Sequence, residues 1–317
     1  MFRGSKIFVA GHAGLLGGAI VRRLKENGYS RLVTRTRDEL DLMRQGAVDA
    51  FFAAERPRVV FLAAGLTGGI SANIARPADF LHVNLIIQDN LFEAAKRHGV
   101  EDLVFFGSSC VYPKGLARPI AEDDLLAGPI EETSAPYAIA KIAGIKACKA
   151  YNEQYLSTRF IAMVPNSIYG PGDSFDPVSS HVLAALIARI ADARERGFPC
   201  LTLWGTGTPR REFIYCDDAA DAAIFALEHA GEMENEHYNV GTGTDYSIRE
   251  LAEMISSEIG YEGEIAWDAS KPDGTARKLL ESARFASLGW SAKVGLQDGI
   301  RRTCEWYLKM KKGVRCG

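Results

Sequence analysis

Short runs of apolar residues alternate with longer amphipathic stretches through the first half of the chain. Strand-like apolar runs occur at 7–10, 31–34, 59–63 and 103–106, and helix-like patterns lie between them at 19–27, 47–55 and 84–98. Continuous apolar runs are typical of parallel strands that are covered on both faces. The order of these elements predicts an α/β fold with a Rossmann-type doubly wound parallel sheet.

The pattern changes after a further strand-like run at 160–164. Loops rich in Gly, Pro and Asp then alternate with helix-like patterns at 181–196, 217–230 and 247–260, while 238–240 is a strand that can return to the main sheet. We expect residues 1–165 to form the Rossmann domain, with later segments returning to it. Residues 166–317 are expected to form mainly a smaller C-terminal α/β substrate lobe.

Charge and cysteine content narrow the class of protein. The 37 basic and 40 acidic residues give a net charge of −3, which does not favour binding to nucleic acid. No apolar stretch is long enough to span a membrane, Met1 leads directly into a strand without a signal peptide, and the basic run Lys309–Lys312 reads as a solvated helix end. Six cysteines without CxxC spacing indicate reduced thiols of a cytoplasmic protein and no metal site.

A glycine-rich turn directly follows the first predicted strand. Gly11, Gly14 and Gly17 form a GxxGxxG pattern that opens a helix, so the backbone can approach a pyrophosphate at the helix N-terminus. A plain strand-to-helix turn is the alternative, but the position in a βαβ unit favours a dinucleotide. The residues expected to bind it here are Gly11, His12, Gly14, Leu15, Leu16 and Gly17.

The end of the second predicted strand indicates which dinucleotide is preferred. Arginine suits a 2′-phosphate, whereas an acidic residue suits the free ribose, so Arg37, with Arg35 second, predicts NADP(H). Asp41 is expected beside the adenine, and Ala63 and Ala64 beneath the cofactor; ordinary loop roles are the alternative.

Tyr137 and Lys141 stand four residues apart in a predicted helix, and Ser108 lies upstream. Residues at this spacing share one helix face, and a nearby ammonium would lower the pKa of the phenol. The phenol could then exchange a proton with a carbonyl or alcohol that the serine holds. On its own, a Tyr/Lys pair at this spacing is more often a solvated surface pair. The predicted nucleotide-binding turn is the observation that favours a catalytic role.

With that turn in place, Ser108, Tyr137 and Lys141 resemble the triad of the extended short-chain dehydrogenase/reductases, and further motifs resemble the GDP-L-fucose synthase family within them. The resemblance implies NADPH, a GDP-4-keto-6-deoxy sugar that is epimerised at C3 and C5 and reduced at C4, and a homodimer. The motifs that carry it lie at 10–14, 35–42, 68–73, 107–114, 136–146, 204–213, 239–243 and 271–278.

The resemblance assigns further residues to the chemistry. Cys110 and His181 match the family's additional acid/base pair, and both residue types titrate near enough to neutral pH to invert a carbon next to a ketone. Arginines bind pyrophosphate bidentately. The expected substrate contacts are Asn166, Arg189, Trp204, Arg211 and Lys278.

Two departures from the family pattern keep alternatives open. Ala13 stands where the family usually has Arg, so Arg37 alone would select NADP(H), and Asn166 is shifted by one position in its motif. The shift allows a colitose- or heptose-type sugar, or a C4-reductase without epimerisation. A redox-neutral 4-epimerase is disfavoured by Cys110 and His181, and an inactive dinucleotide sensor by the intact triad.

Overall fold

The computed structural model describes residues 4–176, 180–271 and 273–313. Its centre is a six-stranded parallel sheet in the order β2-β1-β3-β4-β5-β9, as the apolar runs predicted. The last strand is contributed by a segment more than seventy residues beyond the fifth, so the chain returns to the sheet late. The bounds are β1 Ile7–Ala10, β2 Leu32–Val33, β3 Val59–Leu62, β4 Asp102–Phe106, β5 Arg159–Pro165 and β9 Tyr238–Val240.

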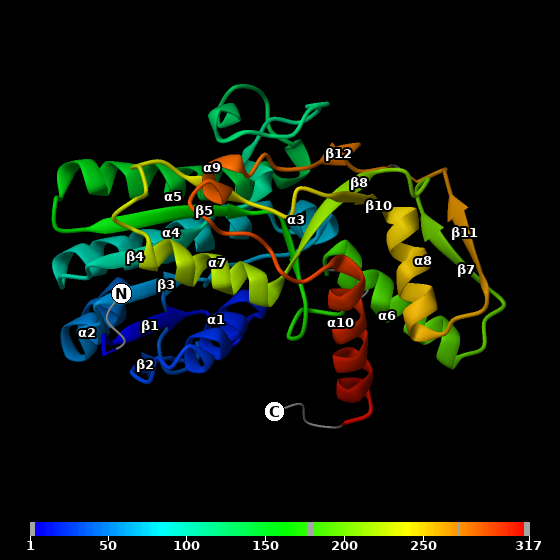
Figure 1. Ribbon diagram of the computed structural model, residues 1–317, viewed down its shortest axis with the longest axis horizontal. Coiled ribbons are helices and arrows are strands. Elements are labelled where there is room, and N and C mark those ends of the chain that lie inside the picture. Colours follow the sequence, from blue (N-terminus) through cyan, green and yellow to red (C-terminus); the bar gives the residue numbers. More distant parts are fainter. Residues whose placement is uncertain (1–3, 177–179, 272, 314–317) are drawn as a thin grey trace.

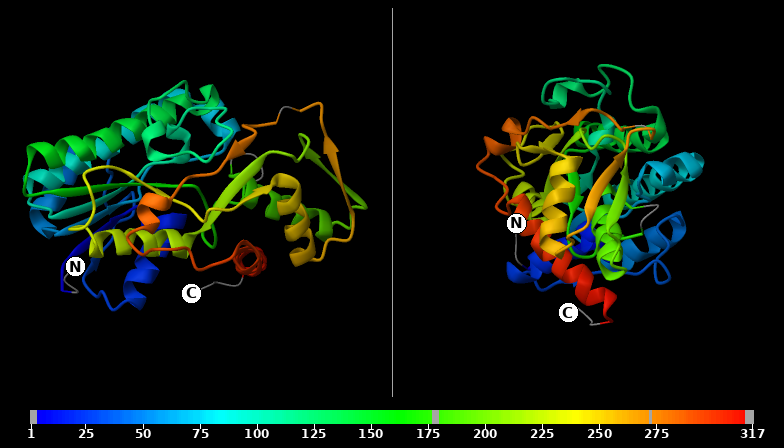
Figure 2. Two further views of the ribbon diagram at one scale, coloured as in Figure 1. Left: turned by 45° about the horizontal axis from the view of Figure 1, so that its top comes forward. Right: turned by 90° about the vertical axis from the view of Figure 1, so that its right-hand side faces the viewer.

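Helices cover both faces of this sheet (Figures 1 and 2). Side chains alternate along β1, so Ile7 and Val9 enter one core with α1 and α7, while Phe8 and Ala10 enter the other with α2, α4 and α5. Burial on both faces explains why the strands read as continuous apolar runs. The helices are α1 Leu15–Glu26, α2 Gln45–Glu55, α4 Pro77–Arg97, α5 Ala135–Gln154 and α7 Cys216–Glu228.

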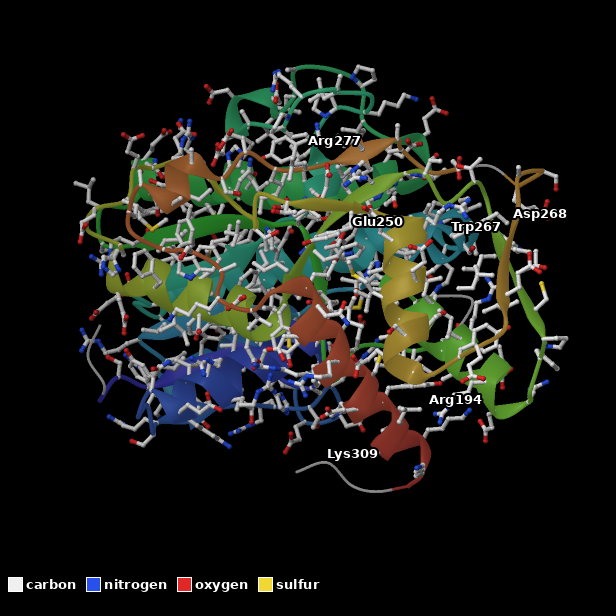
Figure 3. All side chains as sticks on the ribbon, turned by 45° about the vertical axis from the view of Figure 1, so that its right-hand side comes forward. Arg194, Glu250, Trp267, Asp268, Arg277 and Lys309 are labelled. Atoms are coloured by element: carbon white, nitrogen blue, oxygen red, sulfur yellow. The ribbon has the colours of Figure 1, made fainter. Side chains whose placement is uncertain are left out.

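A smaller group of elements lies to the right of the main sheet in Figure 1. Strand β8 pairs with β6, β10 and β12, and β7 pairs separately with β11. Figure 3 shows Trp267 and Asp268 on β11, at the outer side of this group, and Arg277 on β12. The elements are β6 Ser167–Tyr169, α6 Val182–Glu195, β7 Cys200–Trp204, β8 Arg210–Tyr215, β10 Asp245–Ser247, α8 Ile248–Ile259, β11 Glu264–Asp268, β12 Arg277–Lys278 and α10 Leu296–Lys311. The short helix α9 Ala283–Ala286 instead packs against β9 of the main sheet (Figure 1).

Several helix boundaries differ from the expected ones. The first helix begins at Leu15 rather than residue 19, because Gly14 is its N-cap. The helix expected at 84–98 begins at Pro77, since proline is well tolerated in the first helical turn. Helix α3 (Ile70–Ala75) and the single-turn 3₁₀ helices η1 Ser109–Val111, η2 Glu122–Asp124 and η3 Glu132–Ser134 were not predicted.

The strand order puts the crevice that is expected of a doubly wound sheet at the carboxyl ends of β1 and β3. The chain moves from β1 outward to β2 and then crosses back to β3 on the other side of β1. Ligands of doubly wound sheets bind outside the carboxyl ends of the strands at such a switch point. The loops after β1 and β3 therefore face each other where a dinucleotide would bind.

Candidate active site

The turn after β1 is shaped by glycines that no other residue could replace without movement. Gly11 has a φ of +88°, and a Cβ there would lie 2.6 Å from the Ala64 nitrogen in the loop after β3. A Cβ on Gly17 would lie 2.1 Å from the Gly11 carbonyl oxygen. The turn is thus a backbone cradle at the switch point, closed on one side by α1 and on the other by Ala63 and Ala64.

The polar groups of this turn fit a bound nucleotide. The side-chain Nδ1 atom of His12 is buried and has no hydrogen-bond partner among the described residues. Gly14 caps α1 without a side chain, so the first turn, with Leu15 and Leu16, presents free backbone N–H groups. An unpaired buried nitrogen beside a helix N-terminus fits the polar part of a dinucleotide.

The two arginines after β2 have different surroundings. The Arg35 guanidinium bonds to Glu55 at 2.7 Å and lies 5.5 Å from the Phe51 ring centroid. Arg37 is exposed and forms no hydrogen bond or ion pair with any residue that the structure describes. Asp41 accepts from the Met43 backbone nitrogen at 3.1 Å. Arg37 is therefore the cation that is free to meet a phosphate.

The three residues of the predicted triad meet at the carboxyl end of β4. Ser108 follows β4 and caps η1, while Tyr137 and Lys141 lie one turn apart on α5. The Ser108 hydroxyl bonds to the Tyr137 phenol, and the Lys141 nitrogen lies 5.8 Å from the phenol ring centroid. A Cβ on Gly65, in the loop after β3, would lie 3.8 Å from that nitrogen, which places Lys141 beside the cofactor crevice.

Protonation in this site differs from the sequence-based expectation. Burial raises the pKa of Tyr137 well above its ordinary value, and the nearby Cys110 raises it further against the Ser108 hydrogen bond. Burial also lowers the pKa of Lys141 to about 8. The prediction that the phenol pKa would be lowered is therefore wrong for this structure, because burial raises it and Lys141 is not among the groups that shift it.

Cys110 lies next to the triad in an electropositive setting. Burial raises its pKa, but the Lys278 ammonium and hydrogen bonds with Ser108 and Ser134 outweigh burial and lower it overall. The Lys278 nitrogen is 3.7 Å from the Cys110 sulfur. A half-buried thiol beside a cation is suited to proton transfer near neutral pH.

His181 lies on a different element from these residues. It is the N-cap of α6 and is exposed, and surrounding protein lowers its pKa by desolvation. Among the described residues no hydrogen bond or ion pair joins it to Cys110 or Tyr137. Its role as the second acid/base group stays a prediction.

The expected substrate cations lie on the smaller group of elements. Arg211 on β8 stands opposite Lys278 in the parallel β8–β12 pairing. Burial lowers the pKa of Arg211, so its charge is held in a partly desolvated position. Arg189 on α6 donates to the Thr202 carbonyl at 2.7 Å. Trp204 is 67% exposed at the end of β7, which makes its ring available for stacking.

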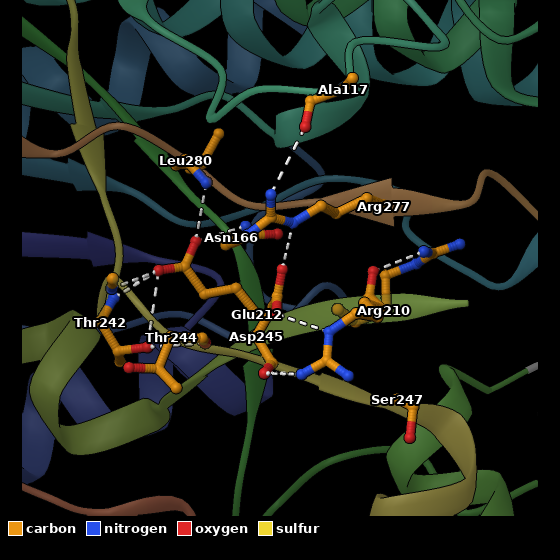
Figure 4. Close-up of polar contacts among 12 residues, drawn as sticks. Ala117, Asn166, Arg210, Glu212, Thr242, Thr244, Asp245, Ser247, Arg277 and Leu280 are labelled. Carbon is orange, nitrogen blue, oxygen red and sulfur yellow. Dashed lines mark hydrogen bonds and ion pairs between the residues drawn. The ribbon is translucent and has the colours of Figure 1, made fainter. Parts of the chain in front are cut away.

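Asn166 lies in a different environment from the other substrate candidates. Its side chain is buried, donates to Glu212 at 2.6 Å and accepts from the Ser167 nitrogen at 3.0 Å. Glu212 is fully buried and also accepts from the backbone nitrogens of Thr242, Gly243 and Leu280 (Figure 4). This geometry favours a structural role for Asn166, because both of its polar groups are satisfied by protein.

Three residues near the site were missed by the sequence reasoning. Asn84 on α4 accepts from the Leu66 nitrogen at 3.1 Å and fixes the loop after β3, next to Lys141. Ser134 bonds to Cys110, and Glu212 connects β8 to three other segments. A signal existed for each: a polar residue on the buried face of a helix, a hydroxyl three residues before Tyr137, and a carboxylate between Arg211 and an apolar strand.

Comparison with known proteins shows which family has this architecture. Residues 7–241 match the model of the NAD dependent epimerase/dehydratase family, and the chain belongs to that family. Within it, the chain is 51% identical to GDP-L-fucose synthase 1 of Arabidopsis thaliana over 97% of this chain and 94% of that protein. It is 48% identical to GDP-L-fucose synthase of Escherichia coli, with 98% of both chains covered.

A solved structure agrees with these relatives. GDP-mannoheptose C4 reductase of Campylobacter jejuni with NADP bound superposes with a TM-score of 0.89 at 40% identity, over 97% of this chain and 99% of that one. The predicted resemblance and the Rossmann-type fold are thereby confirmed.

Proposed function

We propose that this protein is an NADPH-dependent enzyme that epimerises C3 and C5 of GDP-4-keto-6-deoxy-D-mannose and reduces C4, giving GDP-L-fucose. The observation that carries the proposal is the position of Cys110, with Lys278 at its sulfur, directly beside the Ser108–Tyr137 pair. A reductase alone needs no such thiol. The chain is also more similar to the GDP-L-fucose synthases of Arabidopsis thaliana and Escherichia coli, at 51% and 48% identity, than to the heptose C4 reductase, at 40%.

Epimerisation uses the acidity of carbons that neighbour the ketone. Removal of a proton from C3 or C5 leaves an enolate whose charge rests on the C4 oxygen. Cys110, as thiolate, takes that proton, and the hydroxyls of Ser108 and Tyr137 donate hydrogen bonds to the oxygen. His181 returns a proton on the opposite face of the ring.

Reduction follows at the same carbonyl. Bound NADPH supplies the hydride for C4. Tyr137 is protonated throughout the physiological range because burial raises its pKa, so it can act as the acid for the C4 oxygen. The Lys141 ammonium, beside the crevice, stabilises the phenolate that forms when that proton leaves.

The remaining site residues hold the two nucleotides. The turn 11–17, with Ala63 and Ala64, would receive the cofactor pyrophosphate, and Arg37 its 2′-phosphate, with Asp41 near the adenine. The GDP pyrophosphate would meet Arg189 and Arg211, and the guanine would meet the exposed indole of Trp204. Lys278 is a further cation on this side, and its ammonium also contacts the Cys110 sulfur. In this division residues 1–165 form mainly the NADP(H) part and 166–317 mainly the sugar part.

Two further properties belong to this proposal. Five cysteines in the described residues are free thiols, which supports a reducing, cytoplasmic location. In that same part of the chain no helix is both long and apolar enough to cross a membrane. A homodimer is expected from the family resemblance, and light scattering after gel filtration would measure it.

The test is incubation with GDP-4-keto-6-deoxy-D-mannose and NADPH, with the product identified by NMR. In heavy water we expect deuterium at C3 and C5, and we expect Cys110→Ser to prevent its uptake, whereas Cys200→Ser, at an exposed position, should not. NADPH consumption without deuterium uptake would instead identify a C4-reductase like the heptose enzyme. No consumption at all would reject the sugar.

A further inference from the structure

Lys278 and Cys110 meet although they are 168 residues apart in the chain. Cys110 lies in η1, directly after the carboxyl end of β4, and Lys278 ends the two-residue strand β12. The lysine nitrogen lies 3.7 Å from the sulfur, within hydrogen-bonding distance for this atom pair. The family resemblance assigns Lys278 to the substrate, whereas the structure places its ammonium in contact with the thiol.

The groups around the Cys110 sulfur either stabilise a negative charge on it or carry no charge themselves. The Ser108 and Ser134 hydroxyls, from the start of η1 and from η3, bond to it, and the guanidinium of Arg211 on β8 acts on it as a second cation. Tyr137 on α5 is neutral, since burial raises its pKa. No carboxylate among the described residues pairs with Lys278.

The lysine is also held in place by its strand. Lys278 pairs with Arg211 in the β12–β8 register, and two residues later the Leu280 nitrogen donates to the buried Glu212 at 3.0 Å. Glu212 connects the same strand to the β9–β10 loop and to Asn166. The ammonium is therefore presented to Cys110 by a hydrogen-bonded framework rather than by a mobile loop.

We propose that Lys278 is a positioning residue for epimerisation, whose ammonium keeps the Cys110 sulfur as the thiolate that removes the C3 and C5 protons. This inference rests on the proposed function for its consequence in catalysis. The Cys110 thiol releases its proton to solvent. The thiolate then takes a proton from carbon, and the electron pair of that C–H bond passes to the C4 oxygen. The lowered pKa of Cys110 agrees with this arrangement.

The charge state of Cys110 can be measured without any sugar. Iodoacetamide reacts with thiolates, so the pH dependence of Cys110 alkylation, followed by peptide mass spectrometry, reports its titration. The exposed Cys200 in the same sample serves as the internal reference. We expect the Cys110 midpoint to lie below that of Cys200 in the wild type.

Substitutions of Lys278 measure its contribution to the Cys110 midpoint. Lys278→Met should move the midpoint up by about one pH unit and lower alkylation at pH 7 by up to about tenfold, and Lys278→Arg should restore it. The control is Lys293→Met, which removes one charge from an exposed side chain and should change nothing. Deuterium uptake at C3 and C5 should fall in parallel with alkylation, whereas a lysine that only anchors pyrophosphate would raise KM and leave alkylation unchanged.

The two proposals fail in different ways. An unshifted Cys110 midpoint in Lys278→Met, or a wild-type midpoint no lower than that of Cys200, overturns the role of Lys278 whatever the enzyme's substrate. The second comparison needs no variant to fold. A lysine-dependent midpoint without turnover of GDP-4-keto-6-deoxy-D-mannose supports the thiolate and rejects the sugar.

Discussion

The cofactor end and the sugar end of the proposed site are built in different ways. The cofactor end is seven consecutive residues, 11–17, whose backbone forms the surface and in which one added methyl group would collide with a carbonyl oxygen. The sugar end is assembled from β4–η1, α5, β8 and β12, and its properties depend on side-chain charges and on burial. The first should therefore be sensitive to shape, and the second to charge and to single protons.

The largest effect is expected at the sugar end. Tyr137→Phe keeps the ring packed against Phe80, with centroids 6.1 Å apart, but removes the proton donor for the C4 oxygen. We expect kcat for reduction to fall by about 10²- to 10⁴-fold with NADPH affinity unchanged. NADPH oxidation at 340 nm and fluorescence titration measure the two quantities. Tyr155→Phe, at the far end of α5, is the control, and reduction that survives in Tyr137→Phe would exclude this residue as the acid.

The cofactor end can be broken by a single methyl group. In Gly17→Ala the new Cβ would meet the Gly11 oxygen at 2.1 Å, so the turn must open. We expect a loss of about 2–4 kcal/mol in free energy of unfolding and at least about tenfold weaker NADPH binding.

The neighbouring glycine supplies a matched control for that substitution. A Cβ on Gly18 would lie 3.4 Å from the His12 oxygen, an ordinary contact, and alanine is the better helix former. Gly18→Ala should therefore leave stability and binding near wild type in denaturant melts and titrations. Similar losses in both variants would mean that the turn does not depend on the close approach at Gly17.

A substitution of Lys141 measures how much the buried charge at the sugar end lowers the free energy of unfolding. The pKa of this buried lysine is lowered to about 8, so between about pH 8 and 10.5 the unfolded chain binds more protons than the folded one, and stability rises with pH. Below pH 8 the full penalty applies, about 3 kcal/mol for such a shift. Lys141→Met should thus be inactive yet more stable at pH 7, by up to that amount less the lost contacts with the Phe105 and Tyr137 rings.

Denaturant unfolding of the ligand-free enzyme at pH 7 and at pH 10 measures this difference. The gap between the variant and the wild type should narrow at the higher pH, since the wild-type lysine is then neutral in the folded state. A gap that stays constant, or a variant less stable at both pH values, would show that Lys141 is not penalised by burial.

The same contrast explains what the sequence could predict. The parallel sheet and the turn 11–17 were predictable because each signal lies within one short segment: a continuous apolar run, or glycines at fixed spacing. The short strands β6, β7, β8, β10, β11 and β12 were not, because two to six residues in loops rich in Gly and Pro carry little periodicity. Helix α3 is similarly short and leaves Ile70 and Ile74 exposed, so it has no clear apolar face.

The side chains at the site show the same difference between features that a short segment predicts and features that depend on the whole fold. The Tyr137–Lys141 pairing follows from helical spacing, but the direction of the phenol pKa does not, since it depends on how deeply α5 is buried. The contact of Lys278 with Cys110 depends on the β8–β12 register and on the Glu212 hydrogen bonds. No local pattern encodes a contact between residues that far apart.

The smallest predicted effect lies at the edge of the cofactor end, where charge rather than shape should matter. Arg37 is exposed and unpaired among the described residues, whereas Arg35 is engaged with Glu55 and Phe51, so only Arg37 can turn toward a 2′-phosphate without breaking a contact. Because Ala13 supplies no second cation, Arg37→Ala should weaken NADPH binding about tenfold, or ~1.4 kcal/mol, and leave NADH binding unchanged. Arg35→Ala should leave the ratio of the two affinities unchanged. A changed ratio in Arg35→Ala but not in Arg37→Ala would reverse the assignment and place the phosphate over α2 rather than at the end of β2.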